Sequence, residues 1–265
     1  MKLLITTILL LPIVLWTGCS DDSTTVEPVA QNGRLKMYFV DSPAAFDSVI
    51  ICVEKVEVHK SGNDSTSGWF VINDSTRYFD LLQLTNGASA VLGDTSLSAG
   101  QYTQIRLIIG NGSYVIDSGV RHDLEIPSGS QTGLKLTHQF TIESEKLYEL
   151  VLDFNVEKSI LITGNGKYKL KPTIRIMPIV ISGSISGQVL PLDAQPIIWT
   201  VYGTDTISTF TDSQGFFKLM ALYQGIYDVN IIPADTMMYR DTIITGIQII
   251  PNQETNIGLV EIQPQ

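Results

Sequence analysis

The stretch of residues 48–59 reads SVIICVEKVEVH and decides the fold class of this chain. β-branched residues dominate it, and apolar and polar residues alternate in its second half, with the period of two that is typical of a β-strand. The pattern predicts that Val56 and Val58 face the core. It also predicts that three polar side chains of the same stretch face water, namely Lys55, Glu57 and His59.

Short runs of similar composition follow one another from Leu35 onward, and turn-forming residues such as Asp41-Ser42-Pro43 separate them. Gly164-Asn165-Gly166 predicts a tight hairpin, because these residues tolerate a positive φ. The segment FDLLQLTNGASAVLG, which begins at Phe79, fits either a short helix or a strand followed by a loop. The chain as a whole predicts an all-β fold of two antiparallel β-sandwich domains, immunoglobulin-like or transthyretin-like.

Length and composition are sufficient for two domains, since the chain has 265 residues and 44% of them are apolar. We expect the first sandwich over residues 33–181. The second, over residues 182–265, consists of short and evenly spaced runs such as IIWTVYG and YDVNII. No helical period interrupts these runs, so the second domain is expected to be a compact all-β module.

The pattern Leu-x-x-Gly-x-Tyr occurs twice, at residues 97–102 and 222–227, each time before an alternating strand. The glycine permits a turn, and the tyrosine packs its ring while its hydroxyl returns to the backbone, as in a tyrosine corner. A further turn is expected in TDSQGFF, where a carboxylate caps the loop and a glycine allows the reversal. The structural turn residues expected from these patterns are Gly100, Tyr102, Asp212, Gly215, Gly225 and Tyr227.

The N-terminus reads MKLLITTILLLPIVLWTGC and predicts a lipoprotein signal peptide over residues 1–18, with lipid attached to Cys19. Its apolar run of about fourteen residues is shorter than the roughly twenty that a membrane-spanning helix needs. Trp16 stands where the usual pattern has leucine, so a plain signal peptide with an incidental cysteine is the alternative. Residues 19–32 are polar and acidic and predict a flexible tether. The acidic pair after Cys19 leaves two locations open, the cell surface and the periplasmic face of the outer membrane.

Charge and cysteine content restrict the partners of the chain. The formal net charge is −10 at pH 7, which argues against binding of the acidic body to nucleic acid or to anionic membrane surfaces, since either needs basic patches. The two cysteines are Cys19 and Cys52. Lipid on the first leaves the second without a partner for a disulfide, and its β-branched neighbours predict a buried, unreactive thiol.

The sequence contains no recognisable catalytic or cofactor-binding motif: the usual zinc-protease, serine-hydrolase, dithiol and phosphate-binding patterns are missing. We therefore expect neither an enzyme nor a metal or cofactor site. The three histidines, His59, His122 and His138, lie in separate segments and are expected on strand surfaces or in loops. Arg121-His122-Asp123 resembles a fragment of an acid–base site, but without a nucleophile it predicts a polar hairpin edge.

Asp41 and Asp153 are the most unusual carboxylates of the sequence, because each interrupts a run of apolar strand residues. A buried carboxylate must be hydrogen-bonded or paired, so we expect Asp41 to cap the following turn and Asp153 to bind a neighbouring loop or Lys158. A calcium site with Asp47 or Asp117 is one alternative. A hydrolase that uses Asp41, Asp153 and His122 is another, and a glycosidase of this kind needs its two carboxylates roughly 5–10 Å apart.

Ligand recognition has two weaker signals. The segment IPSGSQTGLKL is a polar loop of a composition suited to hydroxyl-rich ligands, with Ser128, Ser130 and Gln131 as its candidate contacts, although a plain solvated crossover loop is the favoured interpretation. Trp69 and Trp199 would stack on a sugar ring if they were exposed, but core packing is the expected role of each.

Six segments of the first predicted domain carry a family resemblance: MYFVDSPAAFDSVIICVEKVEVHKSG from Met37, FDLLQLTNG from Phe79, LSAGQYTQIRLIIG from Leu97, IPSGSQTGLKL from Ile126, LVLDFNVEKSI from Leu150 and GNGKYKLKPTIRI from Gly164. Through these segments the domain resembles the family of bacterial lipoprotein domains called domain of unknown function 4382. The resemblance extends over Gly33 to Pro178. The resemblance implies a β fold and a lipoprotein, with no established activity.

The second predicted domain is similar to carboxypeptidase regulatory-like modules, through GQV at Gly187, TDSQGFF at Thr211 and LYQGIY at Leu222. Such modules resemble carbohydrate-binding sandwiches in fold and often act as spacers or docking units, which is an analogy of fold alone. Together these observations predict a non-enzymatic, lipid-anchored outer-membrane protein for surface recognition, adhesion or envelope assembly. The expected partners are the membrane, through the lipid, and a glycan or an envelope protein. A periplasmic accessory subunit is the alternative.

Overall fold

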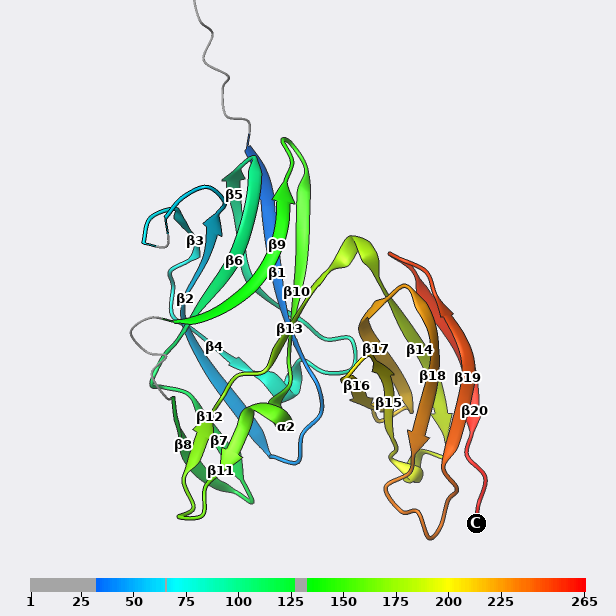
Figure 1. The fold of residues 1–265 in the computed structure, drawn as a ribbon. Helices are drawn as coiled ribbons and strands as arrows, with labels where there is room; N and C mark the ends of the chain where they lie inside the picture. The colour runs from blue at the N-terminus through cyan, green and yellow to red at the C-terminus, as the bar shows by residue number, and fades with distance from the viewer. Residues whose placement is uncertain (1–31, 65, 127–132) are drawn as a thin grey trace, which may run out of the picture. The chain divides into compact units, whose positions relative to one another are not determined.

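The computed structural model describes residues 32–64, 66–126 and 133–265. The predicted signal peptide, Cys19 and the three loop residues Ser128, Ser130 and Gln131 lie outside the described residues, as does the predicted tether except for Asn32, which begins a strand. The chain forms strands and a few short helical turns (Figure 1). No helix in the described ranges has the length and apolar character needed to cross a membrane.

Two sheets build the first sandwich. Sheet I has the order β13-β10-β1-β5, with β1 (Asn32–Asp41), β5 (Ala90–Ser98), β10 (Leu147–Phe154) and β13 (Ile174–Pro178). Sheet II has the order β11-β12-β8-β7-β2-β6-β9, and β3 and β4 also pair with β2. Its strands are β2 (Ser48–Lys60), β3 (Trp69–Asn73), β4 (Arg77–Asp80), β6 (Gly100–Ile109), β7 (Tyr114–Asp117), β8 (Val120–Glu125), β9 (Leu134–Ile142), β11 (Ile160–Ile162) and β12 (Tyr168–Leu170). Short helices η1 (Leu81–Gln83) and α2 (Val156–Ser159) connect strands.

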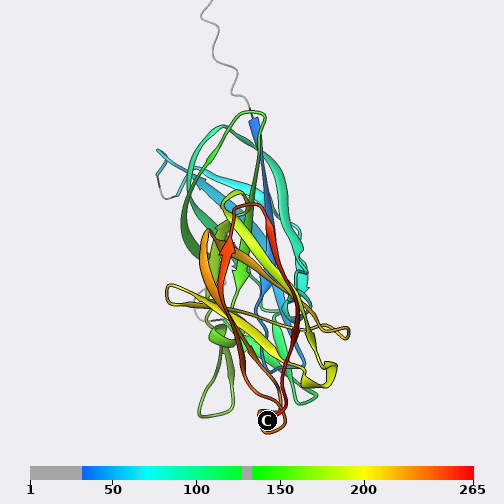
Figure 2. The same ribbon diagram turned by 90° about the vertical axis from the view of Figure 1, so that its right-hand side faces the viewer.

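Two further sheets follow from Ser182 onward. Sheet III has the order β17-β14-β20, with β14 (Ser182–Leu190), β17 (Phe216–Tyr223) and β20 (Glu254–Glu261). Sheet IV has the order β16-β15-β18-β19, with β15 (Ile197–Tyr202), β16 (Asp205–Phe210), β18 (Gly225–Ile232) and β19 (Thr242–Ile249). The short helices η2 (Ile179–Ile181) and η3 (Leu192–Ala194) flank β14. In Figure 2 the red strands β19 and β20 face the viewer.

The fold is all-β, as predicted, and most of its strand pairs are antiparallel. Three pairs in the described part of the chain are parallel: β1 with β10, β8 with β12, and β14 with β20. The hairpin predicted at Gly164-Asn165-Gly166 is confirmed, since β11 and β12 pair antiparallel around it. The segment from Phe79 is a strand end and the short helix η1, followed by a loop and β5.

Each sandwich encloses its own hydrophobic core. In the first, the ring of Phe39 on β1 meets Phe79 and Phe154 edge to face, with centroids 5.6 and 5.8 Å apart. In the second, the core includes Ile198 and Val229. A third, smaller cluster joins side chains of sheet I to β17, comprising Val40, Val151, Met177 and Ala221. Residues Gln31–Gln265 accordingly form one compact unit.

The prediction that Glu57 and His59 face water was wrong, because both are buried. Lys55 and Arg106 bind the Glu57 carboxylate, with a 2.7 Å salt bridge from Lys55 Nζ and a 2.7 Å hydrogen bond from Arg106 Nε. The His59 ring lies 5.0 Å from that of Trp69, and its Nε2 donates to the Asp64 carbonyl at 2.8 Å. Long side chains of neighbouring strands therefore cover the face of β2 that the alternation assigns to solvent.

Candidate functional site

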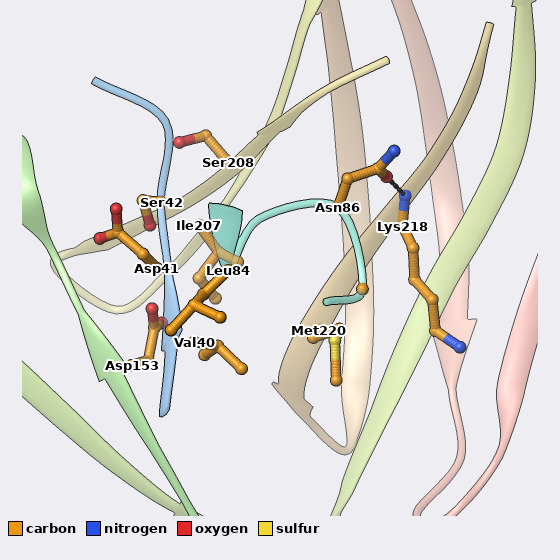
Figure 3. Close-up of a pocket in the computed structure, with 11 residues that line it drawn as sticks. Val40, Asp41, Ser42, Leu84, Asn86, Asp153, Ile207, Ser208, Lys218 and Met220 are labelled. Carbon is orange, nitrogen blue, oxygen red and sulfur yellow. Dashed lines mark hydrogen bonds between the residues drawn. The ribbon is translucent and has the colours of Figure 1, made fainter. Parts of the chain in front are cut away.

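Asp41 and Asp153, the two carboxylates singled out in the sequence, line the same small cavity (Figure 3). Asp41 ends β1, and Asp153 lies near the end of β10, which runs parallel beside it. Ser42, Leu84, Ile207 and Ser208 also line the cavity, whose volume is about 20 Å³. A cavity of this size holds one water molecule and excludes a sugar ring.

The Asp41 carboxyl is buried with one oxygen unpaired. Its Oδ1 accepts a 3.2 Å hydrogen bond from the backbone N–H of Val156, the first residue of α2, while Oδ2 has no partner. Burial raises the pKa of Asp41 to about 9, against the opposing effect of the Val156 and Ser42 backbone N–H groups. The carboxyl is therefore protonated at neutral pH, which makes it a poor general base.

Asp153 is paired with Arg175 on β13, and Lys158, which the sequence suggested as a partner, is not involved. Two guanidinium nitrogens donate to Asp153 Oδ2 at 2.6 and 3.2 Å. A third nitrogen of Arg175 donates to the Ala221 carbonyl of β17 at 2.7 Å. Burial raises the pKa of Asp153, and the Arg175 charge opposes this. Arg175 therefore binds Asp153 within sheet I and, through the Ala221 carbonyl, links sheet I to sheet III.

The other groups of the calcium and hydrolase alternatives lie elsewhere. Asp47 Oδ2 accepts from Gly119 N–H at 2.7 Å, and Asp117 Oδ2 accepts from the Tyr168 hydroxyl at 2.6 Å. The ring of His122, on β8, stacks on Tyr168 at 4.3 Å. Among the described residues, no three His, Cys, Asp or Glu side chains gather in a way that would hold a metal ion. Of the proposed constellation, Asp41 and Asp153 line one cavity, whereas Asp47 and Asp117 lie at the matching ends of the paired strands β2 and β7.

The remaining candidate side chains pack within the protein. The Arg106 guanidinium lies 4.0 Å from the centroid of the Trp69 ring, and Trp199 on β15 is half-buried between Ser208 and Asn230 of the neighbouring strands. Cys52 is buried and unpaired. His138 is half-buried beside Phe140, burial lowers its pKa, and its Nε2 has no partner.

The two tyrosine motifs have the same geometry. Tyr102 donates from its hydroxyl to the Ser98 carbonyl at 3.0 Å, and Tyr227 donates to the Tyr223 carbonyl at 2.9 Å. Gly100 and Gly225 start the strands that carry these tyrosines, β6 and β18. Both rings belong to the cores of their sandwiches, so these residues serve the fold.

The turn Thr211–Phe217 is held by its aspartate. Asp212 Oδ1 accepts from the backbone N–H groups of Gln214 and Phe216, each at 2.9 Å. Gly215 has a φ of 83°, and a Cβ there would lie 2.3 Å from the Val189 carbonyl oxygen, so no other residue fits. This turn connects β16 to β17 and lies beside the end of β14 that leads into η3. We call this end of the second sandwich the loop end.

That loop end carries a group of exposed apolar side chains, which we call the loop surface: Leu192, Phe210, Met237 and Met238. Met237 is 89% exposed. Leu192 and Phe210 also line a cavity of about 690 Å³ together with Pro196 and Ala234. The sequence analysis missed this surface, although adjacent methionines in a segment between two predicted strands were a signal for it.

Hydrogen bonds hold the loops of this surface together. Ala234 N–H donates to the Ala194 carbonyl at 2.9 Å, and the Tyr239 hydroxyl donates to Asp193 Oδ2 at 2.9 Å. Asp235 Oδ1 accepts from the N–H groups of Met237 and Met238 at 2.9 and 3.2 Å. The exposed methionines therefore stand on a pre-formed turn.

A second concave region lies over the outer face of sheet III, with a volume of about 470 Å³. The exposed ring of Phe216 and the amides of Gln188 and Asn256 line it, and the Lys218–Glu254 ion pair crosses it at 2.6 Å. An aromatic ring beside amides and charges is a combination that binds hydroxyl-rich ligands.

A family model described as "Domain of unknown function (DUF4382)" matches residues 32–172. The chain belongs to this family. The DUF4382 match contains Asp41, Asn86 and Asp153, whereas Arg175 and the whole loop surface lie beyond its end. No curated protein matches the chain.

Three solved structures illustrate the likenesses of this DUF4382 protein. A mutant type II cohesin–X-dockerin complex from Acetivibrio cellulolyticus is 19% identical, with 31% of this chain and 58% of that chain covered and a TM-score of 0.26. The chain thus spans 58% of the length of that protein. The minor pilin of Streptococcus agalactiae is 13% identical over 87% and 96% of the chains, with a TM-score of 0.25. A shaft pilin SpaA mutant from Lactobacillus rhamnosus GG is 9% identical over 89% and 97%, with a TM-score of 0.26. Scores this low carry no information about function.

Proposed function

We propose that the protein is a non-enzymatic, lipid-anchored outer-membrane module that recognises a protein partner through the loop surface of its second sandwich. The anchor follows from the N-terminal pattern that ends in Gly18-Cys19. The loop surface is the observation that carries the recognition role. The second sandwich, with its similarity to carboxypeptidase regulatory-like modules, is then the docking unit.

Exposed apolar side chains that gather on pre-formed loops favour protein contact. Contiguous apolar surface on a folded protein marks interaction sites, and methionine adapts its shape to a partner. Burying one such half-exposed side chain at an interface contributes about 1 kcal/mol. Leu192, Phe210, Met237 and Met238 would together supply the apolar centre that such an interface needs. The same loops carry the exposed polar residues Asp193, Gln195 and Asp235.

The position of the loop surface also supports this role. β14 has nine residues and connects η2 to η3, so its ends are roughly 30 Å apart at about 3.3 Å per residue. Leu192 belongs to η3. The other end of β14 begins beside η2, which lines a cavity together with Leu147, the first residue of β10. The loop surface thus lies at the end of the second sandwich away from η2.

The absence of enzyme activity remains part of the proposal. Asp41 is protonated at neutral pH, Asp153 is bound by Arg175, and the cavity between them is too small for a substrate. His122 lies against Tyr168 and does not line this cavity. These observations weigh against the hydrolase alternative, and we propose no cofactor.

A second candidate function is carbohydrate binding in the concave region over sheet III. The exposed Phe216 ring offers a flat apolar face, and Gln188 and Asn256 carry amides beside it. The volume of about 470 Å³ falls within the range of small-molecule sites. This candidate predicts a ligand on glycan arrays, which a purely protein-binding module would not give.

The test compares variants of the chain in cells by crosslinking and affinity capture. Phe210→Ser and Met237→Ser should abolish a stoichiometric crosslinked neighbour, while the control Val120→Ser, an exposed position on β8, should retain it. The proposal fails if no stoichiometric neighbour exists or if all three variants behave alike. Glycan arrays with residues 20–265 and with Phe216→Ser test the second candidate.

Labelling of intact against permeabilised cells addresses the location. Labelling before permeabilisation would support display on the surface. Protection until permeabilisation would support the periplasmic accessory subunit.

A further inference from the structure

The point at which the chain enters the first sandwich is tied to the turn between β9 and β10. Glu145 N–H donates to the Asn32 carbonyl at 2.9 Å, and Arg34 N–H donates to the Lys146 carbonyl at 2.9 Å. A Cβ on Gly33 would lie 2.2 Å from the Glu143 carbonyl oxygen, so the chain is closely packed here. Figure 1 shows the start of β1 and the β9–β10 turn together at one end of the first sandwich. The chain that precedes Asn32 therefore joins the first sandwich next to this turn.

Exposed apolar side chains gather at the same place, and we call them the anchor-end patch: Leu147, Val180, Ile181 and Ile250. Val180 is 65% exposed. Leu147 and Val180 line one cavity of about 480 Å³ together with Asn252, whose N–H donates to the Ser182 carbonyl at 2.7 Å. This bond places the β19–β20 turn, which contains Ile250, beside Ile181.

The composition of η2 is unusual for an exposed connection. It consists of three consecutive apolar residues, Ile179-Val180-Ile181, and none of them is buried. Ile179 packs on the small cluster of Val151 and Met177, which accounts for that one side chain. Val180 and Ile181 stay 65% and 42% exposed in the described chain. A contiguous apolar surface of this kind marks a contact with another phase or molecule.

We infer that the anchor-end patch lies against the phospholipid bilayer. This inference rests on the lipid anchor of the proposed function. The sequence predicts a flexible tether between Cys19 and Asn32, and a coil of about thirteen residues has an r.m.s. span of roughly 20 Å, so such a tether would keep the patch near the membrane surface. Among the nearby charges, Arg34 pairs with Asp94 at 2.6 Å and Lys146 with Glu143, and Glu149 accepts a 2.7 Å hydrogen bond from the Tyr38 hydroxyl. The exposed Glu145 of the β9–β10 turn adds one negative charge beside the patch. Apolar side chains at such a surface enter the boundary between headgroups and acyl chains.

The test uses the full-length lipidated protein in vesicles of phosphatidylethanolamine with a minority of phosphatidylglycerol. An environment-sensitive fluorophore is attached to Val180→Cys, and the matched control is Met237→Cys on the loop surface, which is also exposed. The buried thiol of Cys52 is checked by labelling the unsubstituted protein. We expect a blue shift and quenching by brominated phospholipid for the label at 180, and neither change for the label at 237.

The outcomes separate the inference from the anchor. If the protein does not float with the vesicles, the lipid anchor and the inference both fail. If it floats but the label at 180 is no more quenched than that at 237, only the inference fails. A second label at Leu147→Cys repeats the comparison in case substitution in η2 perturbs folding, which circular dichroism would reveal.

Discussion

The side-chain amide of Asn86 pairs with the backbone of Lys218. Its Oδ1 accepts a 2.6 Å hydrogen bond from the Lys218 N–H (Figure 3). Its Nδ2 donates to the Phe216 carbonyl at 3.1 Å. β17 is an edge strand of sheet III, and exposed edges invite unwanted pairing. Asn86 lies in a turn and has a φ of 52°. Its side-chain amide hydrogen-bonds to β17 in the way that the backbone of a paired strand would. The loop after η1 thus covers part of that edge.

Replacing this amide should destabilise the protein. Asn86→Gly keeps the left-handed backbone and removes both hydrogen bonds, so we expect the free energy of unfolding to fall by about 1–2 kcal/mol. Asn252→Gly is the matched control, because Asn252 has a φ of 56° and an exposed side chain. Denaturant unfolding of both variants checks this. Equal losses would mean that the backbone entropy of glycine explains the effect.

The buried pair of Asp153 and Arg175 predicts a larger loss. Arg175→Met leaves the Asp153 carboxylate buried without its partner, and we expect a loss of about 3–5 kcal/mol in the free energy of unfolding. Adding Asp153→Asn should restore part of it, since the unpaired charge is gone. Arg121→Ala in the exposed Arg121–Asp123 pair is the control and should cost less than about 1 kcal/mol. A double variant as unstable as Arg175→Met would contradict this explanation.

Asp41 predicts a pH dependence of stability. Its folded-state pKa of about 9 lies above that of an unfolded aspartate, so the folded protein holds a proton that the unfolded chain releases. Between about pH 4 and pH 9 the free energy of unfolding therefore falls as the pH rises, and above pH 9 this loss of stability stays constant. Asp41→Asn cannot titrate, so its stability relative to the unsubstituted protein should increase by roughly 1 kcal/mol per pH unit across that window. A stability difference that does not change with pH would show an ordinary pKa.

The two tyrosine hydroxyls should contribute similarly to stability. Tyr102→Phe and Tyr227→Phe each remove one hydrogen bond to a backbone carbonyl, for an expected loss of about 1 kcal/mol each. Because the residues lie in separate cores, the double variant should show the sum of both losses. Tyr202→Phe, an exposed position, is the control. Thermal unfolding that leaves either corner variant unchanged would contradict a stabilising role.

Most of the secondary structure was predictable from local signals. Alternating β-branched residues indicated the strands, and the glycines at 164 and 166 indicated the hairpin, because a strand or turn depends on neighbouring residues. The same reasoning failed at Glu57 and His59. Alternation assumes that one face of a strand meets water, whereas Arg106 and Trp69 cover that face of β2.

The candidate sites were predictable only in part. Asp153 stood out because a carboxylate in an apolar strand needs a partner, but its partner Arg175 lies 22 residues later in the chain. The loop surface joins Leu192 and Met237, which no sequence period relates.

The sequence by itself therefore determined the strands and their turns, since these depend on periodicity and on residues close together in the chain. The tertiary structure alone decided which distant side chains meet, such as Asn86 with Lys218, and which apolar ones stay exposed, such as Val180. Those outcomes depend on how whole sheets pack, and burial is a property of the packed surface that no local stretch of sequence contains.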